Sequence, residues 1–204
     1  GDTNTSSESP APEETGITAA GSIAGAGASS QEKAMGGWIA TLASVAPDLT
    51  VTYEAVGSGG GREQFLSGGV QFAGTDSALK AEEKTAAVDR CFGGEALELP
   101  LYISPIAVVY NLPDVTAANI NMSAKTIAEV FSGKTTKWND PAIAAQNEGV
   151  DLPDLAIIPV NRSDESGTTE NFTEYLAAAS EGAWEHEASG DWPIFSRIIS
   201  STSL

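Results

Sequence analysis

The sequence predicts an α/β fold with mainly parallel sheets. From Ile17 onward, strand-like apolar segments alternate with helix-like segments. Loops of glycine, serine, threonine and aspartate follow several of these strands and lead into the next helix. With 204 residues, the chain can form one domain or two small ones. In an open α/β sheet, loops at the carboxyl ends of the strands line the ligand crevice.

The first half of the chain contains three strand–helix units. Ser29 and Glu32 have the spacing of a capping box, so a helix is predicted to open at Ser29. Apolar residues then recur at helical spacing as far as Val45. The predicted elements are, in order, strand 17–24, the helix from Ser29, strand 50–55, a short helix carrying Phe65 and Leu66, strand 71–74, and helix 81–90.

The second half continues the alternation. Proline is tolerated at the first position of a helix, so Pro141 after Asn139-Asp140 predicts another short helix. The predicted elements are strands near 97–103 and 106–111, helix 124–131, the short helix at Pro141, strand 156–160, and a helix that opens at Ser166. Residues 1–16 carry one hydrophobic side chain and are interpreted as a disordered arm.

Composition excludes several classes of function. The chain has 28 acidic and 10 basic residues, a formal charge of −18, which argues against binding to nucleic acid or to anionic lipid. It has one cysteine and one histidine, which excludes a disulfide framework and a Cys/His zinc site, so no cofactor is expected. Cys91 is interpreted as a buried or half-buried thiol. His186 is expected to be exposed in the acidic segment 181–191.

The chemistry-bearing residues point to an oxyanion. Hydroxyls and backbone N–H groups at the helix starts Ser29 and Ser166-Gly167-Thr168 suit an anion, because a helix N-terminus has unpaired donors and a positive dipole end. A guanidinium such as Arg162 can hold two oxygens at once. The alternatives to an anion site are that the helix-start residues are ordinary helix caps and that Arg162 is a surface residue paired with Asp164 or Glu165.

Asp76 is the unusual member of this set. A carboxylate repels an anion unless the anion carries a hydrogen to donate. Hydrogen phosphate carries one and sulfate at neutral pH does not, so Asp76 could discriminate between them. The glycine run 57–61 is not a nucleotide P-loop, because no lysine follows it. It is more often a flexible turn than a ligand cradle.

These segments together carry a family resemblance. The chain resembles the phosphate-binding protein of ABC-type phosphate importers, in the form found in high-GC Gram-positive bacteria. The resemblance covers about residues 17–195. The matching segments are GAGASSQ (25–31), VGSGGGREQF (56–65), QFAGTDSAL (71–79), LPLYISPIAVVYNLP (99–113), IAEVFSGKTTKWNDPAI (127–143) and PVNRSDESGTTENFTEYL (159–176).

The resemblance implies a type II periplasmic-binding-protein-like fold, in which two lobes close on one dehydrated phosphate. It implies phosphate contacts from eight residues, with Asp76 as the proton acceptor and Asp164 orienting Arg162 without touching the ligand. These eight are Ser29, Ser30, Ser58, Asp76, Arg162, Ser166, Gly167 and Thr168. The implied partners are inorganic phosphate and a membrane permease. The protein is expected to be a monomer, lipid-anchored at the outer face of the cell membrane.

The resemblance also divides the chain. Residues 17–98 are assigned to lobe I, 99–195 to lobe II and 196–204 to an irregular tail. Relatives run past 300 residues, so the second half of the fold is expected to be incomplete, with apolar surface and unpaired strand edges left uncovered. Two alternatives stay open: a truncated surface or scaffold protein that binds no phosphate, and a phosphatase-like hydrolase using Ser58 or Ser166 as nucleophile.

Overall fold

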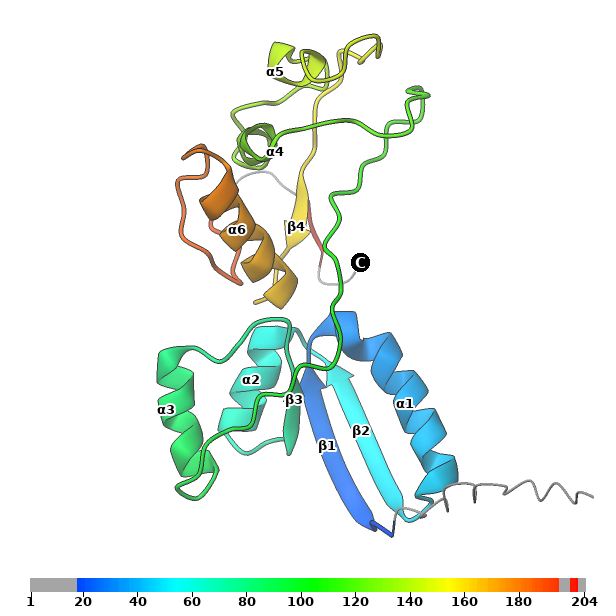
Figure 1. Ribbon diagram of the computed structural model, residues 1–204, viewed down its shortest axis with the longest axis vertical. Helices are drawn as coiled ribbons and strands as arrows, with labels where there is room; N and C mark the ends of the chain where they lie inside the picture. Colours follow the sequence, from blue (N-terminus) through cyan, green and yellow to red (C-terminus); the bar gives the residue numbers. More distant parts are fainter. Residues whose placement is uncertain (1–17, 195–198, 202–204) are drawn as a thin grey trace, which may run out of the picture.

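The computed structural model describes residues 18–194 and 199–201, arranged as two units along the long axis (Figure 1). The first unit is a three-stranded parallel sheet with helices on both sides. Its elements are β1 (Gly21–Gly27), the 3-10 helix η1 (Ser29–Gln31), α1 (Glu32–Val45), β2 (Leu49–Ala55), α2 (Ser58–Leu66), β3 (Phe72–Gly74) and α3 (Ala81–Arg90).

The second unit is mainly helical and lies beyond the carboxyl ends of that sheet (Figure 1). Its two short strands pair in parallel, with Arg162 opposite Ser201. Its elements are α4 (Ala124–Phe131), α5 (Pro141–Ala144), β4 (Val160–Arg162), α6 (Gly167–Ala179) and β5 (Ile199–Ser201).

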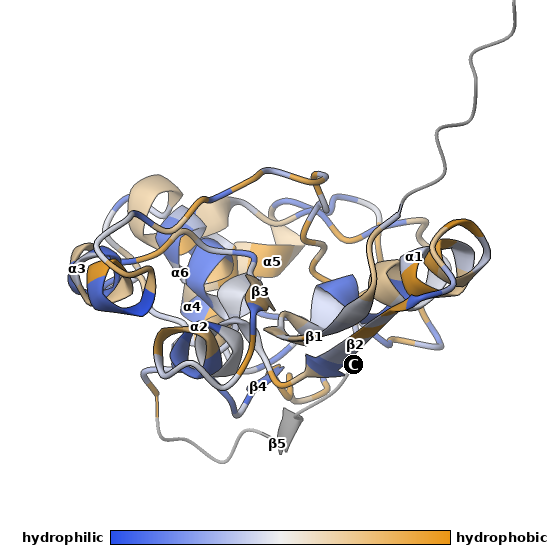
Figure 2. Cartoon of the chain, turned by 90° about the horizontal axis from the view of Figure 1, so that it is seen from below, coloured by the Kyte–Doolittle hydropathy of each residue, from blue (hydrophilic) through white to orange (hydrophobic). Residues whose placement is uncertain are grey.

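The sheet of the first unit has the order β2-β1-β3. The β1–β2 connection and the β2–β3 connection cross the sheet in opposite directions. Right-handed crossovers therefore place α1 and α2 on opposite faces, as the view along the strands shows (Figure 2). All three strands are parallel, so their carboxyl ends share the edge that faces the second unit.

Three predicted helix starts in the second unit are confirmed by their caps. The hydroxyl of Ser123 accepts a hydrogen bond from the Thr126 N–H at the start of α4. Asp140 caps α5, in which Pro141 occupies the first turn as predicted. Ser166 caps α6. Each cap satisfies one backbone donor that a helix start leaves without an intrahelical partner.

The two apolar core clusters of the described residues both lie in the second unit. One is built on Leu112, Val130, Ile143 and Leu152, and the other on Ala128, Leu176 and Trp184. Phe131 packs against both clusters, so α4 joins them. Among the described residues, no helix is long and apolar enough to cross a membrane.

The strands predicted at 97–103 and 106–111 do not form. This connection has no regular structure, and its large apolar side chains are open to solvent, with Ile103 97% and Leu97 81% exposed. A strand is stable only when a neighbour completes its hydrogen-bond ladder. No described segment pairs with this connection. The uncovered apolar surface that the sequence analysis anticipated is present here.

Three smaller predictions are also wrong. The Ser29–Glu32 capping box is absent: residues 29–31 form η1, α1 begins at Glu32, and neither start has a side-chain cap. The strand expected at 156–160 forms at Val160–Arg162, because β5 pairs there and Ala156 makes only an isolated bridge with Lys137. His186 is half-buried, since its ring lies edge-on against Trp184. Cys91 is half-buried, as interpreted.

The predicted lobe limits remain a proposal, and parts of them fall outside the described residues. The arm 1–16 lies outside them, as does most of the tail 196–204. The connection between the units leaves the first unit after Tyr102, whose ring contacts Trp38. It reaches the second unit at Tyr110, whose ring contacts Trp138.

Candidate functional site

The predicted anion-binding residues meet at the junction of the two units. The N-terminal end of α6 faces the edge where β1, β2 and β3 end (Figure 1). Parallel α/β sheets bind ligands at this edge. The structure places all eight residues here: Ser29 and Ser30 after β1, Ser58 at the start of α2, Asp76 after β3, Arg162 at the end of β4, and Ser166, Gly167 and Thr168 at the start of α6.

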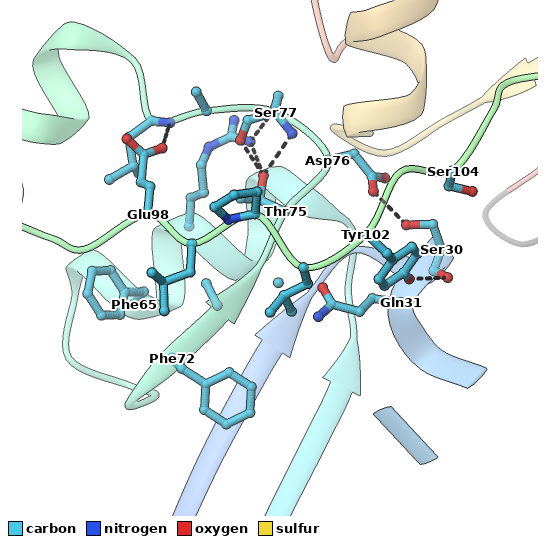
Figure 3. A pocket seen from close by; sticks show the side chains of 18 of the residues that line it. Ser30, Gln31, Phe65, Phe72, Thr75, Asp76, Ser77, Glu98, Tyr102 and Ser104 are labelled. Carbon is cyan, nitrogen blue, oxygen red and sulfur yellow. Dashed lines mark hydrogen bonds between the residues drawn. The ribbon is translucent and has the colours of Figure 1, made fainter. Parts of the chain in front are cut away.

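Asp76 contacts both units. Its Oδ1 accepts a hydrogen bond from the Ser30 hydroxyl at 2.7 Å, and its Oδ2 lies 3.5 Å from the Thr168 hydroxyl. Its N–H donates to Ser58 Oγ at 3.1 Å. Figure 3 shows the Asp76 and Ser30 side chains directed toward one another. The Asp76 carboxylate therefore lies among the hydroxyls that were predicted to hold the anion.

Arg162 is held by Asp164 and also reaches the first unit. Its Nε donates to Asp164 Oδ1 at 2.7 Å, and its Nη2 contacts Asp164 Oδ2 at 2.5 Å. The same Nη2 donates to Ser29 Oγ at 3.1 Å across the junction. A two-point contact with a carboxylate fixes the plane of a guanidinium. Asp164 thus orients Arg162 toward the loop after β1.

Glycine is required where α6 meets α2. A Cβ on Gly167 would lie 2.5 Å from Ser58 Oγ and 2.7 Å from Asp76 Cβ, closer than real atoms approach. Gly57, before α2, has a φ of 84°, and a Cβ there would lie 2.6 Å from Asp164 Oδ2. The helix starts of the two units can approach this closely only because both positions lack side chains.

The two candidate nucleophiles are occupied as hydrogen-bond acceptors. Ser58, 1% exposed, accepts from the Asp76 N–H, and Ser166, 2% exposed, accepts from the Thr169 N–H. Neither contact is to a side chain that could act as a base. An activated serine requires such a base within hydrogen-bond reach. The arrangement favours binding over acyl or phosphoryl transfer.

Sequence reasoning missed two polar residues at this junction. Asn171, one turn into α6, donates its Nδ2 to the carbonyls of both Asp76 and Gly167, at 2.9 and 2.8 Å. Arg62 on α2 is 1% exposed and donates to Thr75 and Ser77, the residues on either side of Asp76. Arg62 was visible within the glycine-rich segment, but only the glycines and Ser58 were considered there.

Tyr53 on β2 supports the loop after β1 through a hydrogen bond. Its hydroxyl donates to the Ala28 carbonyl at 2.9 Å, immediately before η1. Burial, and then the negative charge of Asp76, raise the pKa of Tyr53 above its ordinary value of 10.0. The phenol therefore stays protonated and keeps this hydrogen bond at neutral pH.

An open pocket of about 1030 Å³ adjoins these loops. Ser30, Asp76 and Thr168 lie on its wall, but most of the wall is the apolar connection 95–107 and the β3 segment (Figure 3). Its volume far exceeds that of one inorganic anion. The candidate anion site is therefore the set of polar contacts at the junction, and the large pocket is the uncovered space beside the apolar connection.

The polar groups at the junction are mostly donors, which suit an anion. Among the described residues, no three histidine, cysteine, aspartate or glutamate side chains are grouped to hold a cation. The junction supplies hydroxyl donors, helix N-termini and one guanidinium, with Asp76 as a single acceptor. Such a set can surround a tetrahedral oxyanion and accept one hydrogen from it.

The chain belongs to the PBP superfamily, whose domain matches residues 12–202. It is similar to a Mycobacterium tuberculosis protein named phosphate-binding protein PstS 3, with 44% identity over 158 residues, 78% of this chain and 42% of that protein. The Pasteurella multocida phosphate-binding protein PstS is 40% identical over 163 residues, 80% of this chain and 45% of that protein. The chain thus spans less than half the length of these relatives.

Two solved structures share the fold. A putative phosphate ABC transporter substrate-binding protein with bound phosphate, from Clostridium perfringens, superposes with a TM-score of 0.56 at 20% identity, over 79% of this chain and 58% of that one. A possible phosphate-binding protein from Planctomyces limnophilus gives a TM-score of 0.52 at 22% identity, over 90% and 57%. The predicted periplasmic-binding-protein-like α/β fold is confirmed for the part of it that this chain covers.

Proposed function

We propose that this chain binds inorganic phosphate as hydrogen phosphate and is the substrate-binding component of an ABC-type phosphate importer. One observation carries the proposal: Asp76 and Arg162, from different units, are joined through Ser29, Ser30, Ser58 and Thr168 into one set of contacts. The names of the relatives support phosphate as the ligand.

The proposed roles follow from the chemistry of each group. Hydroxyls and N–H groups at the starts of η1, α2 and α6 donate to the phosphate oxygens, and Arg162 donates two more hydrogen bonds. Asp76 accepts the hydrogen of the ligand. Sulfate has none to offer, so it meets an uncompensated negative charge and is rejected.

The charge of the whole chain does not oppose this site. Fixed dipoles and one guanidinium act at contact distance in a partly enclosed junction, where the effective dielectric constant is low. The surface carboxylates are farther away and are screened within about 10 Å by salt. The formal charge of −18 is therefore compatible with anion binding.

The proposal also covers the oligomeric state, the location and the partner of the protein. The chain acts as a non-enzymatic monomer outside the cytoplasm, lipid-anchored at the outer face of the membrane, and delivers phosphate to a membrane permease. The kinship with substrate-binding proteins supports this setting. In line with this role, the described partners of the Ser58 and Ser166 hydroxyls are backbone N–H groups.

Thermal unfolding tests phosphate binding. A ligand that binds only the folded state stabilises it in proportion to the logarithm of its concentration. Millimolar phosphate should raise the unfolding temperature by about 8–16 °C if the affinity is micromolar. Potassium chloride at matched ionic strength is the control. An unchanged midpoint in phosphate would favour the alternative of a chain that binds no phosphate.

A further inference from the structure

A buried cation, Arg62, holds the loop of Asp76 through Thr75 and Ser77. The Arg62 side chain is 1% exposed, and each of its three guanidinium nitrogens donates to a partner. Its Nε donates to Glu83 Oε1 of α3 at 3.0 Å, and its Nη1 donates to the hydroxyl of Ser77 at 2.8 Å. These partners belong to the first unit. They leave Nη2 as the donor that faces the second unit.

Glu165 of the second unit completes this cluster. Its Oε1 accepts from Arg62 Nη2 at 3.1 Å and from Lys80 Nζ at 3.2 Å. Its carbonyl also accepts from the Gly59 N–H at 3.2 Å, and a Cβ on Gly59 would overlap the Glu165 carboxylate. Glu165 is therefore seated by both its backbone and its side chain on the start of α2 and the residues before α3.

The electrostatics favour this contact. Burial lowers the pKa of Lys80, but the hydrogen bond and charge of Glu165 outweigh burial, so the pKa lies above its ordinary value of 10.5. Separation of the units would leave a donor of the buried Arg62 without its partner, which is costly. The Glu165 carboxylate, 37% exposed, would regain water, so the contact is reversible.

We propose that Glu165 is a positioning residue that latches the loop 164–168 to the Asp76 loop through Arg62 and Lys80. The ligand in this inference rests on the proposed function. The latch keeps the two halves of the anion site in register without touching the anion, because the described contacts of its carboxylate are with Arg62 and Lys80. The two cations neutralise Glu165, which lies next to the predicted ligand residue Ser166.

The latch has a measurable consequence for affinity. When only the joined arrangement binds ligand, the apparent dissociation constant equals the intrinsic one divided by the fraction already joined. Loss of the latch lowers that fraction. A purely electrostatic role predicts the opposite sign, because removing a negative charge near the site would strengthen anion binding.

Glu165→Gln and Glu185→Gln form a matched pair for the test. Each removes one carboxylate charge that pairs with a lysine, but Glu165 joins the two units, whereas Glu185 pairs with Lys134 inside the second unit. Phosphate affinity is measured by calorimetry, and the radius of gyration of the phosphate-free protein by small-angle scattering.

We expect Glu165→Gln to weaken phosphate binding about fivefold, because Gln keeps the Oε1 acceptor for Arg62 and Lys80 but loses the charge. The variant should also enlarge the phosphate-free radius of gyration. Glu185→Gln should leave both within error of wild type. Equal losses in the two variants, tighter binding in Glu165→Gln, or an unchanged radius in that variant would overturn the latch. Failure of the wild-type chain to bind phosphate would instead refute the proposed function, and the scattering comparison would still decide on the latch.

Discussion

At the residue scale, the proposed choice between anions depends on Asp76. Its carboxylate lies between the Ser30 and Thr168 hydroxyls, so an anion held by these loops meets it directly. An asparagine there would present an amide N–H₂ as well as an oxygen, and it would carry no charge. The side chain at position 76 therefore sets both hydrogen-bond polarity and repulsion.

Asp76→Asn should weaken phosphate binding about 10- to 100-fold, the value of one charge-assisted hydrogen bond. The same change should strengthen sulfate binding, because the repulsion is gone. Competition between the two anions in calorimetry measures both effects. Asp48→Asn, an exposed residue just before β2 at the far end of the sheet, is the matched control. An unchanged preference for phosphate in Asp76→Asn would remove Asp76 from the selective role.

The sequence was sufficient to predict residues that lie directly after strands or at helix starts. Asp76 and Ser166 are of this kind, because a parallel sheet brings such positions together whatever the distant packing is. Ser58 was implied by the family resemblance. Asn171 and Arg62 could not be predicted in this way. Their roles depend on contacts with loops about 95 and 103 residues away, namely Asn171 with Asp76 and Arg62 with Glu165, and no local pattern encodes such contacts.

At the element scale, the glycines of α2 determine how closely this helix approaches the sheet. A Cβ on Gly61 would overlap the Cα of Gly27 and lie 2.6 Å from the Ala26 carbonyl oxygen on β1. Glycine is a poor helix former, so its presence inside α2 costs helix stability. The close contact with the central strand explains why it is used, and it places Ser58 beside Asp76.

Gly61→Ala should lower the free energy of unfolding by about 1–3 kcal/mol, because the helix must move off β1. Gly36→Ala on α1, where nothing lies within 4 Å of the added methyl group, should instead raise it by about 0.5–1 kcal/mol. Urea unfolding followed by circular dichroism measures both. A Gly61→Ala protein as stable as wild type would contradict the described contact between α2 and β1.

The accuracy of the element predictions follows from where each element finds its partners. Helices such as Ala81–Arg90 and Ala124–Phe131 were predicted with correct bounds, because periodicity and caps are local signals. The strands expected at 97–103 and 106–111 failed, because alternation and apolar content give no information about whether a partner strand exists.

At the scale of the whole molecule, the proposed binding site coincides with the junction between the units. Cross-unit hydrogen bonds run from Arg162 to Ser29, from Thr168 to Asp76 and from Asn171 to Asp76. The close approaches at Gly57 and Gly167 and the Glu165 cluster lie at the same interface. Ligand binding at the proposed site would therefore be coupled thermodynamically to the association of the two units.

Calorimetric titration of the wild-type chain with phosphate and, separately, with sulfate at neutral pH tests the central claim most directly. We predict that each chain binds one phosphate with micromolar or tighter affinity, a binding free energy of about −8 kcal/mol. Sulfate should bind at least about 100-fold more weakly, because it lacks a hydrogen to donate to Asp76. Equal affinity for the two anions, or no heat of binding with phosphate, would contradict the account.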